Sequence, residues 1–226
     1  MNYKIISTGS KGNAVVINDI ILIDCGVPFK ALKEVYKGLR LVLLTHEHGD
    51  HFNRATIRKL AQERPTLRFG CCDWLVGQLV DCGVDKRNVD VYNPNCRYGY
   101  SDFLLVPFGL THDVPNCGYK ICINAPSGNT TFKNIFYATD TSSLDGIEAK
   151  SYDLYLIEAN HGKDEIAQKI YSKEKYGEYS YERRARENHL SKEAADDFIY
   201  SNIGPNGKFV YLHAHIEEGE SFDNDS

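Results

Sequence analysis

The stretch that decides the fold is "LLTHEHGDHF", residues 43–52. An apolar run there stops at Thr45 and is followed by side chains that commonly bind metal ions: His46, His48, Asp50 and His51. His46 and His48 alternate, so in an extended turn they point the same way and can bind one ion. Asp50 and His51 are adjacent and can turn toward a second ion. The alternative is a solvated histidine-rich loop. The position directly after a strand-like run and before a helix-like segment favours the metal site.

Polar residues stand at the ends of other apolar runs as well. Six strand-length runs end in, or are followed by, an acid or a histidine: Asp24, His46, His112, Asp140, Glu158 and His213. Ligands of open α/β structures bind where the carboxyl ends of strands meet. Helical patterns at 28–38, 53–65, 72–83 and 191–204 lie between the runs. The order of these segments predicts two sheets with helices packed outside them.

Length and charge limit the possible functions. The 226 residues suffice for one large domain or two small ones. A net charge of −5 argues against tight non-specific binding to duplex nucleic acid, but a bound metal could still attract a small anionic substrate. We find no signal-peptide pattern and no apolar run long enough to span a membrane. Together with the odd number of cysteines, seven, this leads us to expect a cytoplasmic protein with reduced thiols and no membrane partner.

The motif T-H-x-H-x-D-H resembles the signature of the metallo-β-lactamase fold, and the resemblance extends through "ILIDCG", "YATDT" and "FVYLHAH" over nearly the whole chain. It implies an α/β (α+β) protein, an αββα sandwich with its active site at one edge of the sheets. We expect a single domain over residues 1–226. The charged, tyrosine-rich segment at about 163–188 is interpreted as an arm. A solvated surface arm is slightly favoured over one that covers substrate or contacts a second subunit.

The resemblance also implies a set of metal ligands. It assigns the first ion to His46, His48 and His112. It assigns the second to Asp50, His51 and a histidine of the last motif, with Asp140 bridging the two ions. Asp24 would orient the metal-binding loop without ligating. The last motif offers both His213 and His215, which strand alternation puts on one face; we prefer His213 because it ends the strand. Two divalent ions are expected, Zn²⁺ first and Mn²⁺ as a possibility.

Further motifs narrow the branch of the fold. The turn "GSKGN" near the N-terminus resembles the GSxGN turn of the YycJ/WalJ-like branch, which contains predicted nucleases and phosphodiesterases. "ENHLSKEAADDFI" resembles the same branch and also the RNase Z group, in which a histidine before a helix approaches the scissile phosphate. His189 is that residue here, and the alternative is an exposed neighbour of the helix. His161, in "IEANHG", is expected to orient Asp140 or a ligand, and Asp50 to orient or deprotonate water.

These observations predict a two-metal phosphodiesterase that acts on a cyclic nucleotide or on a nucleic-acid strand, as an exonuclease would. The compact chain could be similar to the phage-type anti-Pycsar phosphodiesterases. The alternative within the fold is a thioester or lactone hydrolase of the glyoxalase or lactonase kind. A non-enzymatic metal-binding protein is a third possibility. The tyrosine-rich arm and the resemblance make a homodimer the expected assembly.

Overall fold

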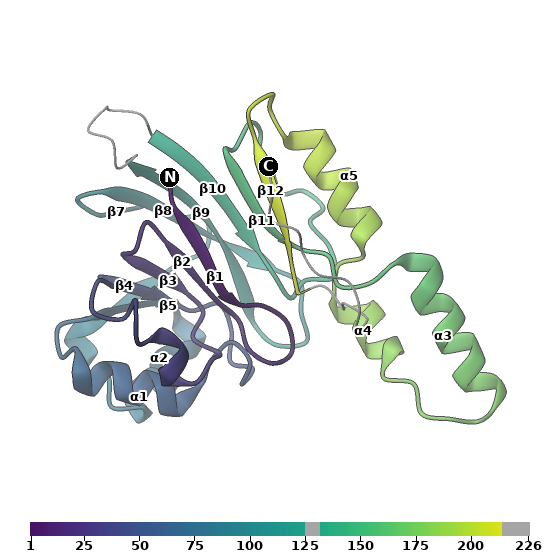
Figure 1. The fold of residues 1–226 in the computed structure, drawn as a ribbon, viewed down its shortest axis with the longest axis horizontal. Helices are drawn as coiled ribbons and strands as arrows, with labels where there is room; N and C mark the ends of the chain where they lie inside the picture. The colour runs from purple at the N-terminus through teal and green to yellow at the C-terminus, as the bar shows by residue number, and fades with distance from the viewer. Residues whose placement is uncertain (125–131, 214–226) are drawn as a thin grey trace.

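The computed structural model describes residues 1–124 and 132–213 and contains two six-stranded sheets (Figure 1). The N-terminal sheet has the order β1 (Tyr3–Ser7), β2 (Ala14–Ile17), β3 (Ile21–Ile23), β4 (Leu41–Leu43), β5 (Arg68–Cys72), β6 (Val89–Tyr92). The C-terminal sheet has the order β12 (Lys208–Leu212), β11 (Leu154–Glu158), β10 (Phe132–Ala138), β9 (Asn116–Asn124), β8 (Phe103–Leu110), β7 (Tyr98–Gly99).

The central strands are buried on both faces, which explains why they are almost uniformly apolar in sequence. In β2, Val15 and Ile17 belong to the core between the sheets, whereas Ala14 and Val16 belong to the core under the outer helices. The side chains of a strand alternate between its two faces, so one short segment contributes to both cores. The four residues of β2 thus contribute to both apolar layers, the one between the sheets and the one under the outer helices.

Helices cover the outer face of each sheet, as the αββα prediction requires. On the N-terminal sheet lie α1 (Arg54–Glu63) and α2 (Val76–Asp81), with the short 3₁₀ turns η2 (Asp73–Leu75) and η3 (Lys86–Asn88). On the C-terminal sheet lies α5 (Lys192–Asn202). The side chains of Asn53 and Ser191 cap α1 and α5 by accepting backbone N–H bonds from Thr56 and Ala194. The predicted fold class and layer order are confirmed.

The charged segment at 163–188 forms two helices, α3 (Lys163–Lys175) and α4 (Glu182–Asn188). Figure 1 shows α3 projecting away from the sheets and α4 returning toward them. The ammonium of Lys173 lies 2.6 Å from the carboxylate of Glu182 and joins the two helices. Only Ile166 and Ile170 of α3 are buried. The outer part of the arm is therefore solvated, and α4 is the part that approaches the sheets.

Two details of the prediction were wrong. The helix expected at 28–38 is only a 3₁₀ turn, η1 (Phe29–Leu32), followed by further turns. Leu32 is the single buried residue of η1, and Phe29, Val35 and Tyr36 still pack against the core although the segment is not an α-helix. The strands β6 and β7 were not expected, because one is only half buried and the other has two residues.

The strand directions bring the polar strand ends together. Strands β3 to β6 pair in parallel in the first sheet, and β10 to β12 do so in the second. Parallel strands end at one edge of their sheet, which is where polar side chains can form a site.

Among the described helices, none is long and apolar enough to cross a membrane.

Candidate metal centre

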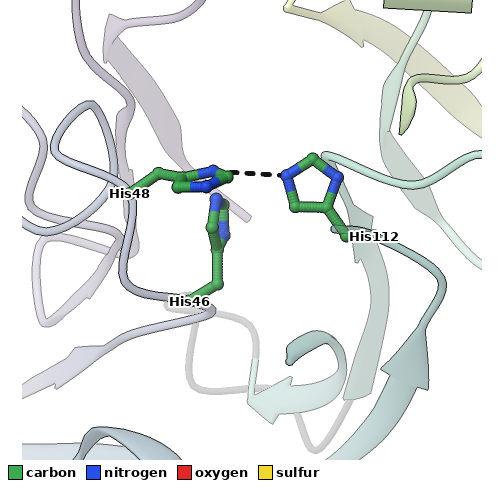
Figure 2. A group of neighbouring side chains, drawn as sticks. All are labelled: His46, His48 and His112. Carbon is green, nitrogen blue, oxygen red and sulfur yellow. Dashed lines mark hydrogen bonds between the residues drawn. The ribbon is translucent and has the colours of Figure 1, made fainter. Parts of the chain in front are cut away.

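Three histidines meet at the edge of the two sheets. His46 and His48 come from the loop after β4, and His112 follows β8 (Figure 2). Their ring centroids are 4.9 to 5.2 Å apart, and one nitrogen of each ring lies within 4.8 Å of the others. The spacing and the facing nitrogens suit a single metal ion. The structure therefore brings together the three residues expected at the first ion.

The hydrogen bonds of His46 leave one of its nitrogens free for a metal. The hydroxyl of Thr45 lies 2.9 Å from a carboxylate oxygen of Asp24, to which it can only donate, and 2.9 Å from His46 Nδ1. The hydroxyl therefore accepts from Nδ1–H, and Nε2 carries the lone pair. This Nε2 is buried and has no hydrogen-bond partner among the residues that the structure describes. An unpartnered buried acceptor is costly, and a metal ion would satisfy it.

His112 is oriented in the same way by the protein backbone. Its Nδ1 lies 3.1 Å from the carbonyl oxygen of Asn188, at the end of α4, and donates to it. Its Nε2 then faces His48, 3.3 Å away. Burial lowers the pKa of His112, and burial followed by the charge of His51 lowers the pKa of His46 to about 2. Both rings are thus neutral donors near pH 7, as metal ligation requires.

A buried carboxylate holds the loop in place. Asp24, just after β3, accepts hydrogen bonds from the backbone N–H of Thr45 at 3.0 Å and from Nδ1 of His51 at 2.7 Å. The hydroxyls of Thr45 and of Tyr137, the latter on the opposite sheet, donate to it as well. Asp24 is fully buried and belongs to none of the metal-binding groups found in the described residues. Its placement agrees with the orienting role that the resemblance implied.

Asp140 lies at the centre of the site. One of its carboxylate oxygens is 2.8 Å from His51 Nε2 and 3.2 Å from His213 Nδ1, and the other is 3.5 Å from His189 Nδ1. It also belongs to two of the three groups whose spacing suits a metal. A carboxylate shared in this way can bridge two ions, the role expected for it.

Three residues of the site share an unusual backbone conformation. Asp24, Asp140 and His213 each follow a strand and have φ of 59°, 56° and 52°. Side chains other than glycine rarely adopt this left-handed region, which asparagine, aspartate and histidine tolerate best. The turn at each strand end directs the side chain into the site, and backbone strain of this kind is found mainly where function requires it.

A second group of side chains lies beyond Asp140. Glu158, the last residue of β11, is fully buried and lies 2.6 Å from His189 Nδ1 and 3.7 Å from His213 Nδ1. Its other oxygen accepts the backbone N–H groups of Thr141 and Leu190. Together with Asp140, these side chains form a group of four that could hold a metal ion.

The histidines near the carboxylates differ in charge from those near Thr45. Burial opposes protonation of His51, but the charges and hydrogen bonds of Asp140 and Asp24 outweigh it and raise its pKa well above the usual range. Burial is likewise outweighed at His189, where Glu158 raises the pKa, and at His213, where Asp140 does so. The buried carboxylates thus favour the protonated form of these three rings.

Not every predicted site residue lies as expected. Asp50 lines the cavity, 3.8 Å from His51 Nε2, but the set Asp50, His51 and His213 does not form one tight group. His51 instead groups with His46 and Asp140. His161 pairs with Ser191 through a β-bridge and does not line the cavity, so its catalytic role stays a prediction. His215 is outside the described residues.

The turn at Gly9–Asn13 supports the loop from the other side. The backbone N–H of Asn13 donates to the carbonyl oxygen of Asp50 at 2.6 Å, and its amide nitrogen lies 2.7 Å from His51 Nε2. Gly26 packs on the same carbonyl so closely that a Cβ would lie 1.7 Å from it. Asn13 of the motif "GSKGN" and Gly26 thus position the metal-binding loop.

Site residues that the sequence had not assigned to catalysis or metal binding include Glu158, Asn13 and Asp113. Glu158 carried a usable signal, because it ends an apolar strand just as Asp24 does. Asp113 lies 3.3 Å from His112 Nε2 and 3.5 Å from His48 Nε2. Its neighbour His112 was predicted as a ligand because it follows an apolar run, but the strand-end pattern does not extend to Asp113. Its position depends on α4, which contacts it from far along the chain.

A cavity of about 240 Å³ opens over these groups. It is lined by Ser10, His48, Asp50, His112, Asp113, Asp140, Asn160, Tyr181, Arg184, Ala185, Asn188, His189 and His213. The two sheets supply its floor and α4 supplies one wall. Neutral nitrogen donors, a shared carboxylate and an unpartnered buried nitrogen meet the requirements of divalent metal ions. The residues present therefore fit the metal centre that the resemblance implies.

Solved structures share this architecture. The metallo-β-lactamase fold protein YhfI from Bacillus subtilis matches with a TM-score of 0.68 at 16% identity, over 94% of this chain and 85% of that one. The short form of human tRNase Z matches with a TM-score of 0.67 at 16% identity, over 95% and 92%. A possible metal-dependent hydrolase from Veillonella parvula matches with a TM-score of 0.61 at 10% identity, over 93% and 84%. No family model and no curated protein matches the sequence. Similarity at this identity establishes a common fold.

Proposed function

We propose that this chain, which has the metallo-β-lactamase fold, is a metal-dependent phosphodiesterase. The observation that carries the proposal is the pair formed by His189 and the buried Glu158, 2.6 Å apart, with the His189 ring centroid 5.5 Å from that of His112 in the first metal-binding group. Cleavage of a phosphodiester requires a proton for the leaving oxygen, and a histidine with a raised pKa can donate one. Further support comes from the similar structures named as a tRNase and as a possible metal-dependent hydrolase.

In this proposal His46, His48 and His112 would hold one divalent ion. As the resemblance implies, Asp50, His51 and His213 would hold a second, with Asp140 shared between the two. Bound ions would supply Lewis acidity for water and for the phosphate oxygens. Zn²⁺ is the expected metal and Mn²⁺ the second choice.

The chain's own residues complete the chemistry. Asp50 lines the cavity and accepts a hydrogen bond from the attacking water, which orients it. His189 uses Nδ1 to donate to Glu158, so Nε2 is the nitrogen that can protonate the leaving oxygen. Glu158 is held by two backbone N–H groups and keeps the ring both protonated and in position.

The test is a substrate panel with the purified protein in Mn²⁺ or Zn²⁺. We expect hydrolysis of bis(p-nitrophenyl) phosphate and of cyclic mononucleotides or labelled single strands, together with bound metal in elemental analysis. The variants His48→Ala and Asp50→Ala should lose turnover while keeping the wild-type circular dichroism spectrum. Full activity in either variant would contradict this mechanism.

The same panel addresses the alternative. A thioester or lactone hydrolase would use the same metal-binding groups but has no need of the His189–Glu158 pair. Hydrolysis of a thioester without phosphodiester activity would favour that alternative. Bound metal without turnover of any ester would instead favour a metal-binding protein. The proposed homodimer is tested separately by light scattering.

A further inference from the structure

We infer that α4 and its N-cap residue Tyr181 recognise a nucleotide: Arg184 binds its phosphate and Tyr181 stacks on its base. This inference rests on the proposed function and specifies its substrate class. It begins with the size of the cavity. About 240 Å³ is below the roughly 300–1,000 Å³ of typical small-molecule sites. A cavity of this size receives the reacting phosphate and one nucleoside, with any further nucleotides outside.

Arg184 is the only lysine or arginine among the described residues that line the cavity. Its guanidinium nitrogen lies 2.5 Å from a carboxylate oxygen of Asp113. The other oxygen of Asp113 faces His112 and His48, so the arginine is held at the mouth of the first metal-binding group. The side chain of Arg184 is 68% exposed, and an ion pair this exposed contributes little to stability. A phosphate can therefore replace Asp113 as the partner of the guanidinium, which binds phosphate through two parallel hydrogen bonds.

Tyr181 is the only aromatic residue other than histidine among the described lining residues. The ammonium of Lys173 lies 4.4 Å from its ring centroid and covers part of the ring. Lys173 also pairs with Glu182, so its ammonium is held in place against the ring of Tyr181. Tyr181 remains 55% exposed although it borders the cavity. Exposed aromatic rings beside a phosphate site are the usual platform for nucleobases.

The spacing of α4 places both groups on one face. Tyr181, Arg184, Ala185 and Asn188 all line the cavity, and their intervals of three and four residues are those of a single helix face. The small side chain of Ala185 leaves room beside Arg184. The carbonyl of Asn188 accepts a hydrogen bond from His112 and ties the end of the helix to the metal centre. The base, the phosphate and the reacting atoms would therefore have a fixed spacing.

The chain offers matched controls. Tyr179 is 85% exposed and does not line the cavity, so Tyr179→Ala removes an equivalent ring from outside it. Arg183 pairs with Glu174 and does not line the cavity, so Arg183→Gln removes an equivalent charge. All four positions are solvent-exposed or half-exposed, and folding should survive each change.

The first experiment measures binding by isothermal titration calorimetry to the metal-loaded protein, with AMP and with inorganic phosphate as probes. AMP should bind more tightly than phosphate to the wild type. Tyr181→Ala should weaken AMP binding roughly 5- to 100-fold, the range seen when a stacking residue is lost, and leave phosphate binding unchanged. Arg184→Gln should weaken both. AMP binding no tighter than phosphate binding, or Tyr181 and Arg184 variants that behave like the two controls, would overturn the inference.

The second experiment separates this inference from the proposed function. It compares hydrolysis of thymidine 5′-(p-nitrophenyl phosphate) with that of methyl p-nitrophenyl phosphate, which has the same leaving group but no base. Tyr181→Ala should raise KM for the thymidine ester alone. Hydrolysis of both esters with unchanged KM in the variants would refute recognition by α4 and leave the phosphodiesterase intact. Binding as described above without hydrolysis of either ester would refute the phosphodiesterase and support nucleotide recognition.

Discussion

The two halves of the metal centre bind protons in opposite ways. Around Thr45, burial, and after it the charge of His51, lowers the pKa of His46, and burial lowers the pKa of His112 although the carboxylates of Asp140 and Asp113 oppose the shift. Around Asp140 and Glu158, the carboxylates raise the pKa of His51, His189 and His213 in spite of burial. Rings of one residue type, all at the same sheet edge, therefore arrive in different charge states because their partners differ.

This difference separates two tasks. Neutral rings with a free nitrogen are ready to bind a metal, whereas the protonated rings must release a proton to metal or donate it to a substrate. His189 suits the second task, because its partner Glu158 is buried and its ring still lines the cavity. The comparison therefore predicts that a substitution near Thr45 alters metal affinity, whereas a substitution near Glu158 alters the pH dependence of turnover.

The largest effect is expected from Asp140→Asn. This change removes the charge shared by three histidines, so metal binding and turnover should both be lost. Elemental analysis and a phosphodiester assay measure the two losses. Asp145→Asn, an exposed carboxylate in the following loop, serves as the control. Retention of two ions per chain in Asp140→Asn would show that the two halves do not share this carboxylate.

The next largest effect is expected from Glu158→Gln. Losing the charge should lower the pKa of His189, shift the alkaline limb of kcat/KM to lower pH and reduce turnover of poor leaving groups by about 10²- to 10⁴-fold. A raised folded-state pKa means that the pair stabilises the protein fully below about pH 6.5 and loses this effect as pH rises through the raised value. An unchanged pH profile, with metal content also unchanged, would remove His189 from the proton transfer.

A smaller effect is expected from Thr45→Val in the neutral half. The variant loses the hydroxyl that accepts from His46 Nδ1 and should weaken metal binding by about 10- to 100-fold. Competition with a chelating dye measures this affinity. The pH profile set by His189 should stay as in the wild type, and a shift there would mean that the two halves are not independent.

Gly26→Ala is expected to have the smallest effect on turnover and to act on the stability of the fold. A Cβ at this position meets the carbonyl oxygen of Asp50, so the loop must move, at a cost of about 1–3 kcal/mol in the free energy of unfolding. Gly49→Ala, in the same loop, has open space around the new methyl group and should be close to neutral. Urea unfolding compares the two. Equal midpoints would mean that the loop does not depend on this contact.

Much of the site could be predicted because strand ends are a local property of sequence. A polar residue that ends an apolar run, such as Asp24 or Asp140, must leave the core where the strand stops, and parallel strands stop at one edge. The same rule applied to Glu158, whose pairing with His189 could not be read because 31 residues separate the two. The helix expected at 28–38 is a short 3₁₀ turn followed by further turns, although Phe29, Leu32, Val35 and Tyr36 supply a helical apolar pattern and pack against the core.

From the sequence, the order of apolar runs and helical patterns predicted the layer order, whereas the three histidines of the first group and the bridging place of Asp140 came from the resemblance of its motifs to those of the metallo-β-lactamase fold. Only the tertiary structure decided which histidines are neutral, because a pKa depends on the charges and burial around a ring and not on its neighbours along the chain. The tertiary structure also brought α4 to the cavity, through contacts of Asn188 and Arg184 with residues more than seventy positions away. Such contacts arise from the packing of distant segments, which no local pattern encodes.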